Sequence, residues 1–236
     1  MKMRAILLLF VVFALTGCAT PALRPEVATD FLQSKVSAMV YLENKTIEYN
    51  EMVYKVLWNE NRQNVSDFSG LWDVDAELTT QLAGDMAALN LAVKPVRAIL
   101  ADEPSYAALV QSIKATRGPD ARNVPLQLNA ETQARFQKAG INYLVVVRAA
   151  GFNISTTTMN SSGGLNLPAI LFVYDIKAGK EEYREMMFSG EYVKWGKSPR
   201  NIESSGMAIL KEAARKMLKT SVEKHFPKVI GLAQVQ

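Results

Sequence analysis

Few residues in this chain can carry out chemistry. The sequence of 236 residues holds one cysteine, Cys18, and one histidine, His225. Structural zinc sites use about four nitrogen or sulfur ligands, and the Ser-His-Asp and Cys-His arrangements need a histidine beside the nucleophile. His225 falls in the last turn of a predicted helix, where a cation suits the helix dipole and needs no catalytic role. We therefore expect no metal and no other cofactor.

The carboxylates are the remaining candidates for catalysis. The densest acidic group in the sequence is Glu181, Glu182, Glu185 and Glu191. Two carboxylates about 5–9.5 Å apart can hydrolyse a glycosidic bond, so a carboxylate-based hydrolase is one hypothesis. The neighbouring Lys180 and Arg184 favour the other interpretation, which is a set of solvated charges on a strand edge. The sequence favours a non-enzymatic role over the hydrolase.

Cys18 is the reactive residue whose surroundings define a role. Met1-Lys2-Met3-Arg4 is charged, Ala5–Leu15 is apolar, and Leu15-Thr16-Gly17-Cys18 contains the small residues of a cleavage site. This order is that of a signal peptide. The apolar run is shorter than the roughly 20 residues that a membrane-spanning helix requires. A buried cysteine that ends an ordinary helix, or a secretion signal that is simply cleaved, is the alternative.

Leu15-Thr16-Gly17-Cys18 resembles the lipobox of bacterial lipoproteins. The resemblance implies cleavage before Cys18, a diacylglycerol thioether on its sulfur, and acylation of the new amine. Each buried CH₂ contributes about 0.8 kcal/mol, so several acyl chains anchor a protein stably. In Gram-negative lipoproteins an aspartate after the cysteine resembles an inner-membrane retention signal, and here Ala19 follows. We expect a protein anchored in the lipid of the outer membrane and facing the periplasm.

The composition indicates one folded domain. Hydrophobic residues make up 49% and charged residues 21% of the chain, which is typical of a globular protein. The net charge of +4 falls to +2 when Lys2 and Arg4 are removed with the signal peptide, so the charge gives no support for nucleic-acid binding. The expected organisation is a signal peptide at 1–17, a lipidated tether at 18–30 and a single periplasmic α/β domain at 31–236.

Hydrophobic periodicity predicts the elements of that domain. The expected strands are 35–42, 91–96, 141–149, 167–175 and 183–193. The expected helices are 49–57, a helix capped by Asp75, a helix opened by Pro104, 130–139 capped by Asn129, and 201–226 ended by Pro227. For residues 52–58 a strand is the alternative. This order predicts an α/β fold with a mixed sheet, helices on its faces, a late antiparallel meander and a long C-terminal helix.

Two segments are predicted to be loops. The first, Gln63–Asp73, is mostly polar but contains Phe68 and Trp72. Because exposed aromatic residues are enriched in interface hot spots, these two are candidate partner contacts; folding back onto the core is the alternative. The second, Gly151–Gly164, is rich in Asn, Ser, Thr and Gly and is predicted to be mobile, without the Gly-Lys-Ser/Thr ending of a phosphate-binding loop.

Charge on the C-terminal helix offers a further contact. Lys211, Arg215, Lys216 and Lys219 project largely away from its apolar face. A basic amphipathic helix can lie on anionic lipid. A solvated outer face on a helix packed against a sheet is the interpretation that we favour.

The stretch from Asn129 to Val147 carries a second resemblance. A helix, then Gly140, then the apolar run from Ile141 resembles a group of bacterial envelope lipoproteins. The group includes the curli-secretion lipoprotein, the activators of penicillin-binding proteins and the N-terminal domain of the Tol translocation β-propeller protein. The chain departs from that group in its short tether and in the lack of an apolar membrane-crossing hairpin at Gly151–Gly164. The resemblance implies no functional residue.

Together these observations predict a lipid-anchored, non-enzymatic accessory protein that assembles or regulates an envelope protein complex. A self-assembling secretion or export component at the outer membrane is the alternative. The expected partners are membrane lipid, through the acyl chains on Cys18, and either another envelope protein or further copies of the chain.

Overall fold

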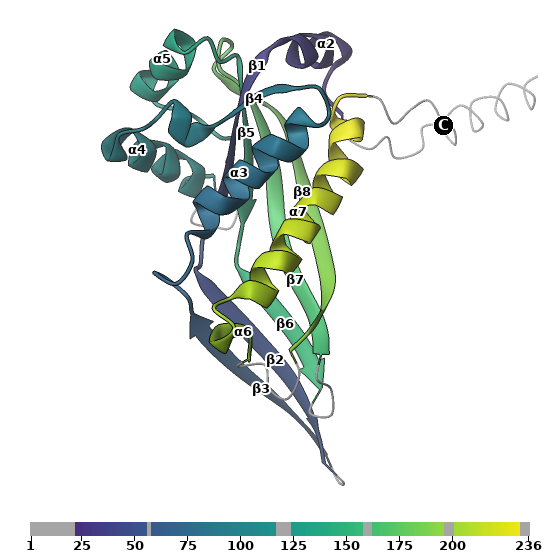
Figure 1. Ribbon diagram of the computed structural model, residues 1–236. Coiled ribbons are helices and arrows are strands. Elements are labelled where there is room, and N and C mark those ends of the chain that lie inside the picture. Colours follow the sequence, from purple (N-terminus) through teal and green to yellow (C-terminus); the bar gives the residue numbers. More distant parts are fainter. Residues whose placement is uncertain (1–21, 56–57, 117–123, 158–161, 196–200, 232–236) are drawn as a thin grey trace, which may run out of the picture.

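The computed structural model describes residues 22–55, 58–116, 124–157, 162–195 and 201–231. Cys18 and the predicted signal peptide lie outside this part of the chain. The described residues form one mixed sheet of eight strands in the order β3-β2-β6-β7-β5-β1-β4, with β8 paired to β7 (Figure 1). The predicted α/β class is confirmed, including the mixed sheet, the late meander and the long C-terminal helix. No helix in the described residues is long and apolar enough to cross a bilayer.

The strands are β1 (Lys35–Leu42), β2 (Thr46–Tyr54), β3 (Asn59–Asp67), β4 (Ala92–Pro95), β5 (Tyr143–Ala149), β6 (Phe152–Thr157), β7 (Ser162–Asp175) and β8 (Lys180–Lys194). The helices are α2 (Pro25–Gln33), α3 (Val74–Ala87), the 3₁₀ turn η1 (Val96–Ala98), α4 (Glu103–Lys114), α5 (Ala130–Lys138), α6 (Asn201–Ser204) and α7 (Ala208–Val229).

Two pairs of strands behave as single long strands with a kink. β5 and β6 both pair with β7 in almost continuous register, which shifts by one residue near Gly151. Gly151 has φ 153°, and a Cβ there would lie 3.4 Å from the carbonyl oxygen of Asn44. β1 and β2 follow the same path beside β5 and β6. The sheet therefore has an upper half (β4, β1, β5 and the adjoining β7 and β8) and a lower half (β3, β2, β6 and the rest of β7 and β8), as Figure 1 shows.

The two halves differ in how their faces are covered. On one face, α2, α3 and α7 pack onto a core that runs through both halves and includes residues of β2 and β6. On the other face, α4 and α5 build a second core with β1, β5 and β7, to which β2, β3 and β6 contribute nothing among the described residues. The upper half is therefore buried on both faces, and the lower half is covered on one.

Burial on both faces explains why the apolar run of β5 is readable in sequence. The N-cap at Asn129 is confirmed, because its Oδ1 accepts the N–H of Thr132 at 2.8 Å. Gly140, with φ 70°, takes the left-handed position after the helix.

Several predicted elements are wrong, and most of them lie in the lower half. Residues 49–54 belong to strand β2 and not to the predicted helix 49–57. The alternative of a strand at 52–58 is therefore correct for residues 52–54, and Val56 and Leu57 lie outside the described residues. The predicted loop Gln63–Asp73 begins as the end of β3. The predicted loop Gly151–Gly164 contains β6 and the start of β7, with 158–161 outside the described residues. In each case one face of the strand is polar and exposed, which removes the apolar signal.

Three helix boundaries also differ from the prediction. Asp73, not Asp75, caps α3, since its side chain accepts the N–H of Ala76. The predicted tether at 18–30 is helical from Pro25, and Val27, Ala28 and Phe31 of α2 are buried. The C-terminal helix is divided at Gly206, which has φ 64°, and it continues past Pro227 to Val229.

Candidate interaction surface

The lower half of the sheet has one face that no helix of the described residues covers, and we call this surface the open face. In β2, Ile47 and Tyr49 point into the core, so alternation places Glu48 and Asn50 on the opposite face. The same rule applied to the paired strands gives the open face: Glu48, Asn50, Met52 and Tyr54 of β2, Asn59, Asn61, Gln63 and Val65 of β3, Asn153 and Ser155 of β6, Gly164 and Asn166 of β7, and Gly190, Tyr192 and Lys194 of β8.

The composition of the open face is unusual for a solvated sheet surface. Its charged members are Glu48 and, at the end of β8, Lys194. Of the nine exposed large apolar side chains in the described residues, four lie here: Met52, Tyr54, Val65 and Tyr192. Depletion of charge with enrichment of Tyr and Met is the composition of the centre of a protein interface. The open face is therefore the best candidate for binding another protein.

The β2–β3 hairpin extends this surface away from the body of the sheet (Figure 1). At its end Tyr54 and Trp58 are 56% and 58% exposed. The N–H of Lys55 donates to the carbonyl of Trp58 at 3.0 Å, and the Lys55 ammonium lies 5.3 Å from the centre of the Trp58 ring. Hydrogen bonds from Lys55 and Arg62 lower the pKa of Glu60 to about 2, so Glu60 stays charged beside them.

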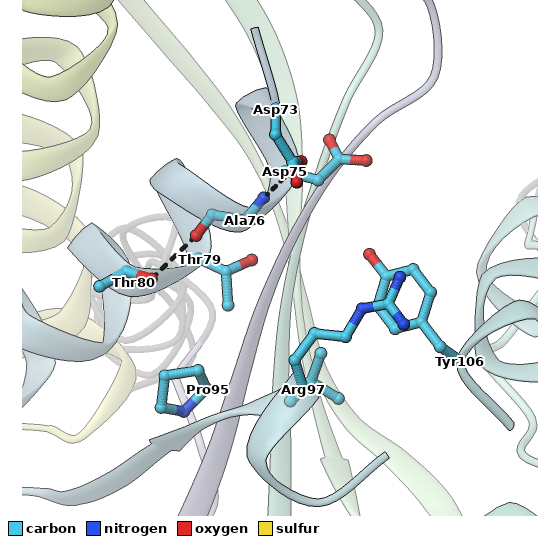
Figure 2. Close-up of a pocket in the computed structure, with 9 residues that line it drawn as sticks. Asp73, Asp75, Ala76, Thr79, Thr80, Pro95, Arg97 and Tyr106 are labelled. Carbon is cyan, nitrogen blue, oxygen red and sulfur yellow. Dashed lines mark hydrogen bonds between the residues drawn. The ribbon is translucent and has the colours of Figure 1, made fainter. Parts of the chain in front are cut away.

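A small cavity of about 180 Å³ lies at the edge of the upper half, between α3, η1 and α4 (Figure 2). It exists because β4 stops at Pro95, while β1 continues past the last residue that β4 pairs with. Side chains of α3 replace the missing strand there: Thr79 Oγ1 accepts the N–H of Val40 at 2.8 Å, and Asp75 Oδ1 accepts the N–H of Leu42 at 2.9 Å. These polar groups satisfy the edge of a strand, which accounts for their presence without a ligand.

The far wall of this cavity is also explained by its own contacts. The Arg97 guanidinium stacks on the Tyr106 ring at 3.4 Å, as Figure 2 shows, and pairs with Glu103 at 2.9 Å. Burial, and then the charge of Asp75, raise the pKa of Tyr106 to about 12, so its hydroxyl stays protonated. No group of three potential metal ligands occurs in the described residues.

The aromatic residues predicted as partner contacts lie in the core. Phe68 is 0% and Trp72 is 6% exposed, and both pack on Phe152 with ring centres 5.9 Å away. The prediction of exposed contacts is therefore wrong for both side chains, and the alternative of folding back onto the core describes them. They are buried because Phe152 packs against them. Phe152 belongs to β6, a strand in a segment that the sequence predicts to be a loop.

The four glutamates of the hydrolase hypothesis do not form a pair. Each has its own partners: Glu181 binds Arg184, Glu182 binds Arg24 and Lys180, Glu185 binds His225, and Glu191 binds Lys216. Glu185 and Glu191 share a face of β8, but six residues at about 3.3 Å place them roughly 20 Å apart. That separation is well beyond the reach of a glycosidase pair.

His225 has a structural partner instead. Its Nδ1 lies 2.9 Å from Glu185 Oε2, and the hydroxyl of Tyr183 donates to the same oxygen at 2.8 Å. Burial, together with Glu185, raises the pKa of Tyr183. This buried group joins the last turns of α7 to β8.

The basic residues of α7 also have partners on neighbouring elements. Arg215 pairs with Glu77 of α3, and Lys216 pairs with Glu191 of β8 at 2.6 Å. These ion pairs fit the interpretation of a solvated helix face packed beside a sheet.

Arg148 is the polar residue that the sequence analysis missed. It is 5% exposed within β5, and its guanidinium donates to Thr116 Oγ1 at 2.5 Å and pairs with Glu43. It lies on the face covered by α4 and α5, where the covered upper half gives way to the open face. A single arginine inside the apolar run of β5 could have indicated a buried ion pair, because a buried charge needs a partner.

No protein-family model matches this sequence, and no curated protein matches it. Several solved structures resemble the fold, among them the following three. A hypothetical protein from Chlamydia trachomatis matches with 10% identity and a TM-score of 0.45, over 84% of this chain and 99% of its own. A PelC dodecamer from Paraburkholderia phytofirmans matches with 9% identity and a TM-score of 0.38, over 86% and 90%. A lipoprotein from Neisseria meningitidis matches with 10% identity and a TM-score of 0.34, over 77% and 98%. These TM-scores lie below 0.5, so we draw no functional conclusion from them.

Proposed function

We propose that this protein is a lipid-anchored accessory protein of the bacterial outer membrane whose open face binds another protein of the envelope. The sequence around Cys18 supports the anchor, and the absence of a paired catalytic group among the described residues directs attention to binding. The observation that carries the proposal is the open face itself. It is poor in charge and carries exposed Tyr and Met side chains, and the helices of the described residues leave it uncovered.

The anchor is tested by fractionation. We expect the full-length protein to sediment with outer membranes, and Cys18→Ala to release it to the soluble periplasmic fraction. A Cys18→Ala protein that still fractionates with the outer membrane would contradict the anchor.

Binding is tested by a photo-crosslinking amino acid placed in the full-length protein in cells. At Tyr192, on the open face, we expect one distinct adduct with an envelope protein. At Leu71, which is equally exposed but lies outside the open face, we expect none. Equal adducts at both positions, or none at either, would refute the proposal. A ladder of self-adducts at Tyr192 would replace it with the self-assembling secretion component.

A further inference from the structure

The end of the β2–β3 hairpin differs from the rest of the open face and suggests a more specific mode of binding. Tyr54 and Trp58, here called the hairpin tip, are two exposed aromatic side chains with charged residues next to them: Lys55, Glu60 and Arg62. An aromatic anchor with a polar rim is the usual arrangement of an interface hot spot. The two contacts between Lys55 and Trp58, a backbone hydrogen bond and an ammonium beside the ring, restrain Trp58 in the unbound chain and lower the cost of ordering it on binding.

The hairpin tip lies far from the point where the lipid anchor enters the domain. The N–H of Leu23 donates to the carbonyl of Val229 at 2.9 Å, which fixes the start of the described chain beside the end of α7. Figure 1 shows that end of α7 and the β2–β3 hairpin at opposite ends of the molecule. Five residue steps separate Cys18 from Leu23, so the anchor reaches at most ~18 Å from the domain.

The length of the sheet exceeds this reach. Tyr143, whose hydroxyl donates to Asp30 of α2, marks the anchored end. From Tyr143 to Thr157 the long kinked strand spans ~46 Å at about 3.3 Å per residue. Thr157 pairs with Met52, and Tyr54 lies two residues farther on. The hairpin tip is therefore ~50 Å from the anchored end, and the tether cannot bring it back to the bilayer while the domain stands upright.

We propose that the hairpin tip inserts into an apolar pocket of a different protein, which meets this chain at the end remote from the anchoring membrane. This inference rests on the proposed function and adds where, and by which side chains, the partner is held. The occupant is a protein and not the anchoring bilayer, because in an upright domain the tip stands ~50 Å from the anchored end while the tether reaches at most ~18 Å.

The tryptophans provide a direct test. The chain has three, and Trp72 and Trp195 are buried while Trp58 is exposed. In vesicles of brominated phospholipid that carry the full lipidated protein, we expect Trp58 emission to be as strong as in vesicles without bromine. Quenching that Trp58→Ser removes would show that the tip enters the bilayer and would overturn the inference.

Crosslinking in cells tests the partner. With the photo-crosslinker at Trp58 we expect an adduct of the same mass as the adduct at Tyr192, and we expect Trp58→Ser to reduce the yield at Tyr192 at least about 10-fold, as for a hot spot. Leu71→Ser is the matched control and should leave the yield unchanged. An adduct at Tyr192 with none at Trp58 refutes this inference and leaves the proposed function standing. Self-adducts at Trp58 also overturn it, and absence of adducts at both positions refutes both proposals.

Discussion

Replacement of Arg148 by methionine tests how much the buried ion pair between β5 and the end of β1 contributes to stability. Arg148 is buried beneath the α4–α5 layer, and its partners Glu43 and Thr116 come from the end of β1 and the end of α4. Methionine keeps the length of the side chain and removes its charge. Glu43 is then left without its cation in a site where its side chain is 22% exposed.

The magnitude follows from that partial exposure. Removing one partner of a fully buried pair costs about 3–5 kcal/mol. Because Glu43 keeps some contact with water, we expect a loss of ~2–3 kcal/mol in the free energy of unfolding, below the fully buried range. With a urea m-value of about 2 kcal/mol/M, the unfolding midpoint should fall by ~1–1.5 M.

Urea unfolding followed by circular dichroism is the assay, and Arg97→Met is the control. Arg97 also pairs with a glutamate, but both side chains are substantially exposed, and such pairs contribute less than about 1 kcal/mol. The double variant Arg148→Met/Glu43→Gln should recover part of the loss, since it leaves no unpaired charge. If Arg148→Met and Arg97→Met shifted the midpoint equally, the reasoning from burial would be refuted.

Three further predictions concern the same fold. Trp72→Ala should lower the free energy of unfolding by ~3–5 kcal/mol in the same urea assay, whereas Trp58→Ala should change it by less than ~0.5 kcal/mol; similar losses would contradict the core position of Trp72. Gly163→Ala should lower the free energy of unfolding by ~1–3 kcal/mol, because the new Cβ would lie 2.4 Å from the carbonyl oxygen of Ser155. Gly164→Ala is the control, since nothing lies within 4 Å of a Cβ there, and a larger loss for Gly164→Ala would contradict this packing. Burial alone would raise the pKa of Glu182, but hydrogen bonds from Lys180 and Arg24 outweigh burial and lower that pKa. The ionised Glu182 therefore stabilises the folded protein above pH ~4.5, and this contribution is lost as the pH falls through the folded-state pKa. Titrated unfolding should therefore show a smaller loss of stability below pH ~4.5 for Glu182→Gln than for the parent protein, and identical profiles would argue against the ion pairs.

The elements that the sequence predicted correctly are those defined by local patterns, such as a helix cap or a continuous apolar run. The capped helix after Asn129 and the apolar strand after Gly140 are local patterns, and α5 and β5 lie where the patterns place them. The C-terminal helix is also local, and the prediction missed only its break near Gly206 and its last residues.

The lower half failed for a physical reason. β2, β6 and the lower parts of β7 and β8 have one face in the core and one in the open face, and the open face is largely polar or glycine-containing. The edge strand β3 contributes no residue to the core clusters. Because alternate residues of β6 are polar, its sequence resembles that of a loop. β3 has almost no buried residue, so its sequence carries no apolar pattern. In β2 the exposed Met52 beside the core residues Tyr49 and Val53 imitates helical spacing. A strand that contributes to function by its exposed face loses the alternation that would reveal it.

The lipid anchor is proposed from the sequence alone, because Leu15-Thr16-Gly17-Cys18 resembles a linear motif that does not depend on the fold. The sequence also determined the fold class, since long apolar runs and capped helices leave few ways to bury their surfaces. Only the tertiary structure decided which aromatic residues are available to a partner. Phe68 and Trp72 lie in a polar stretch of sequence, but Phe152 of β6 packs against them and they are buried. Tyr192 and Trp58 are exposed because no helix of the described residues covers them. Exposure depends on which distant strand lies beside a residue, and no local pattern contains that information.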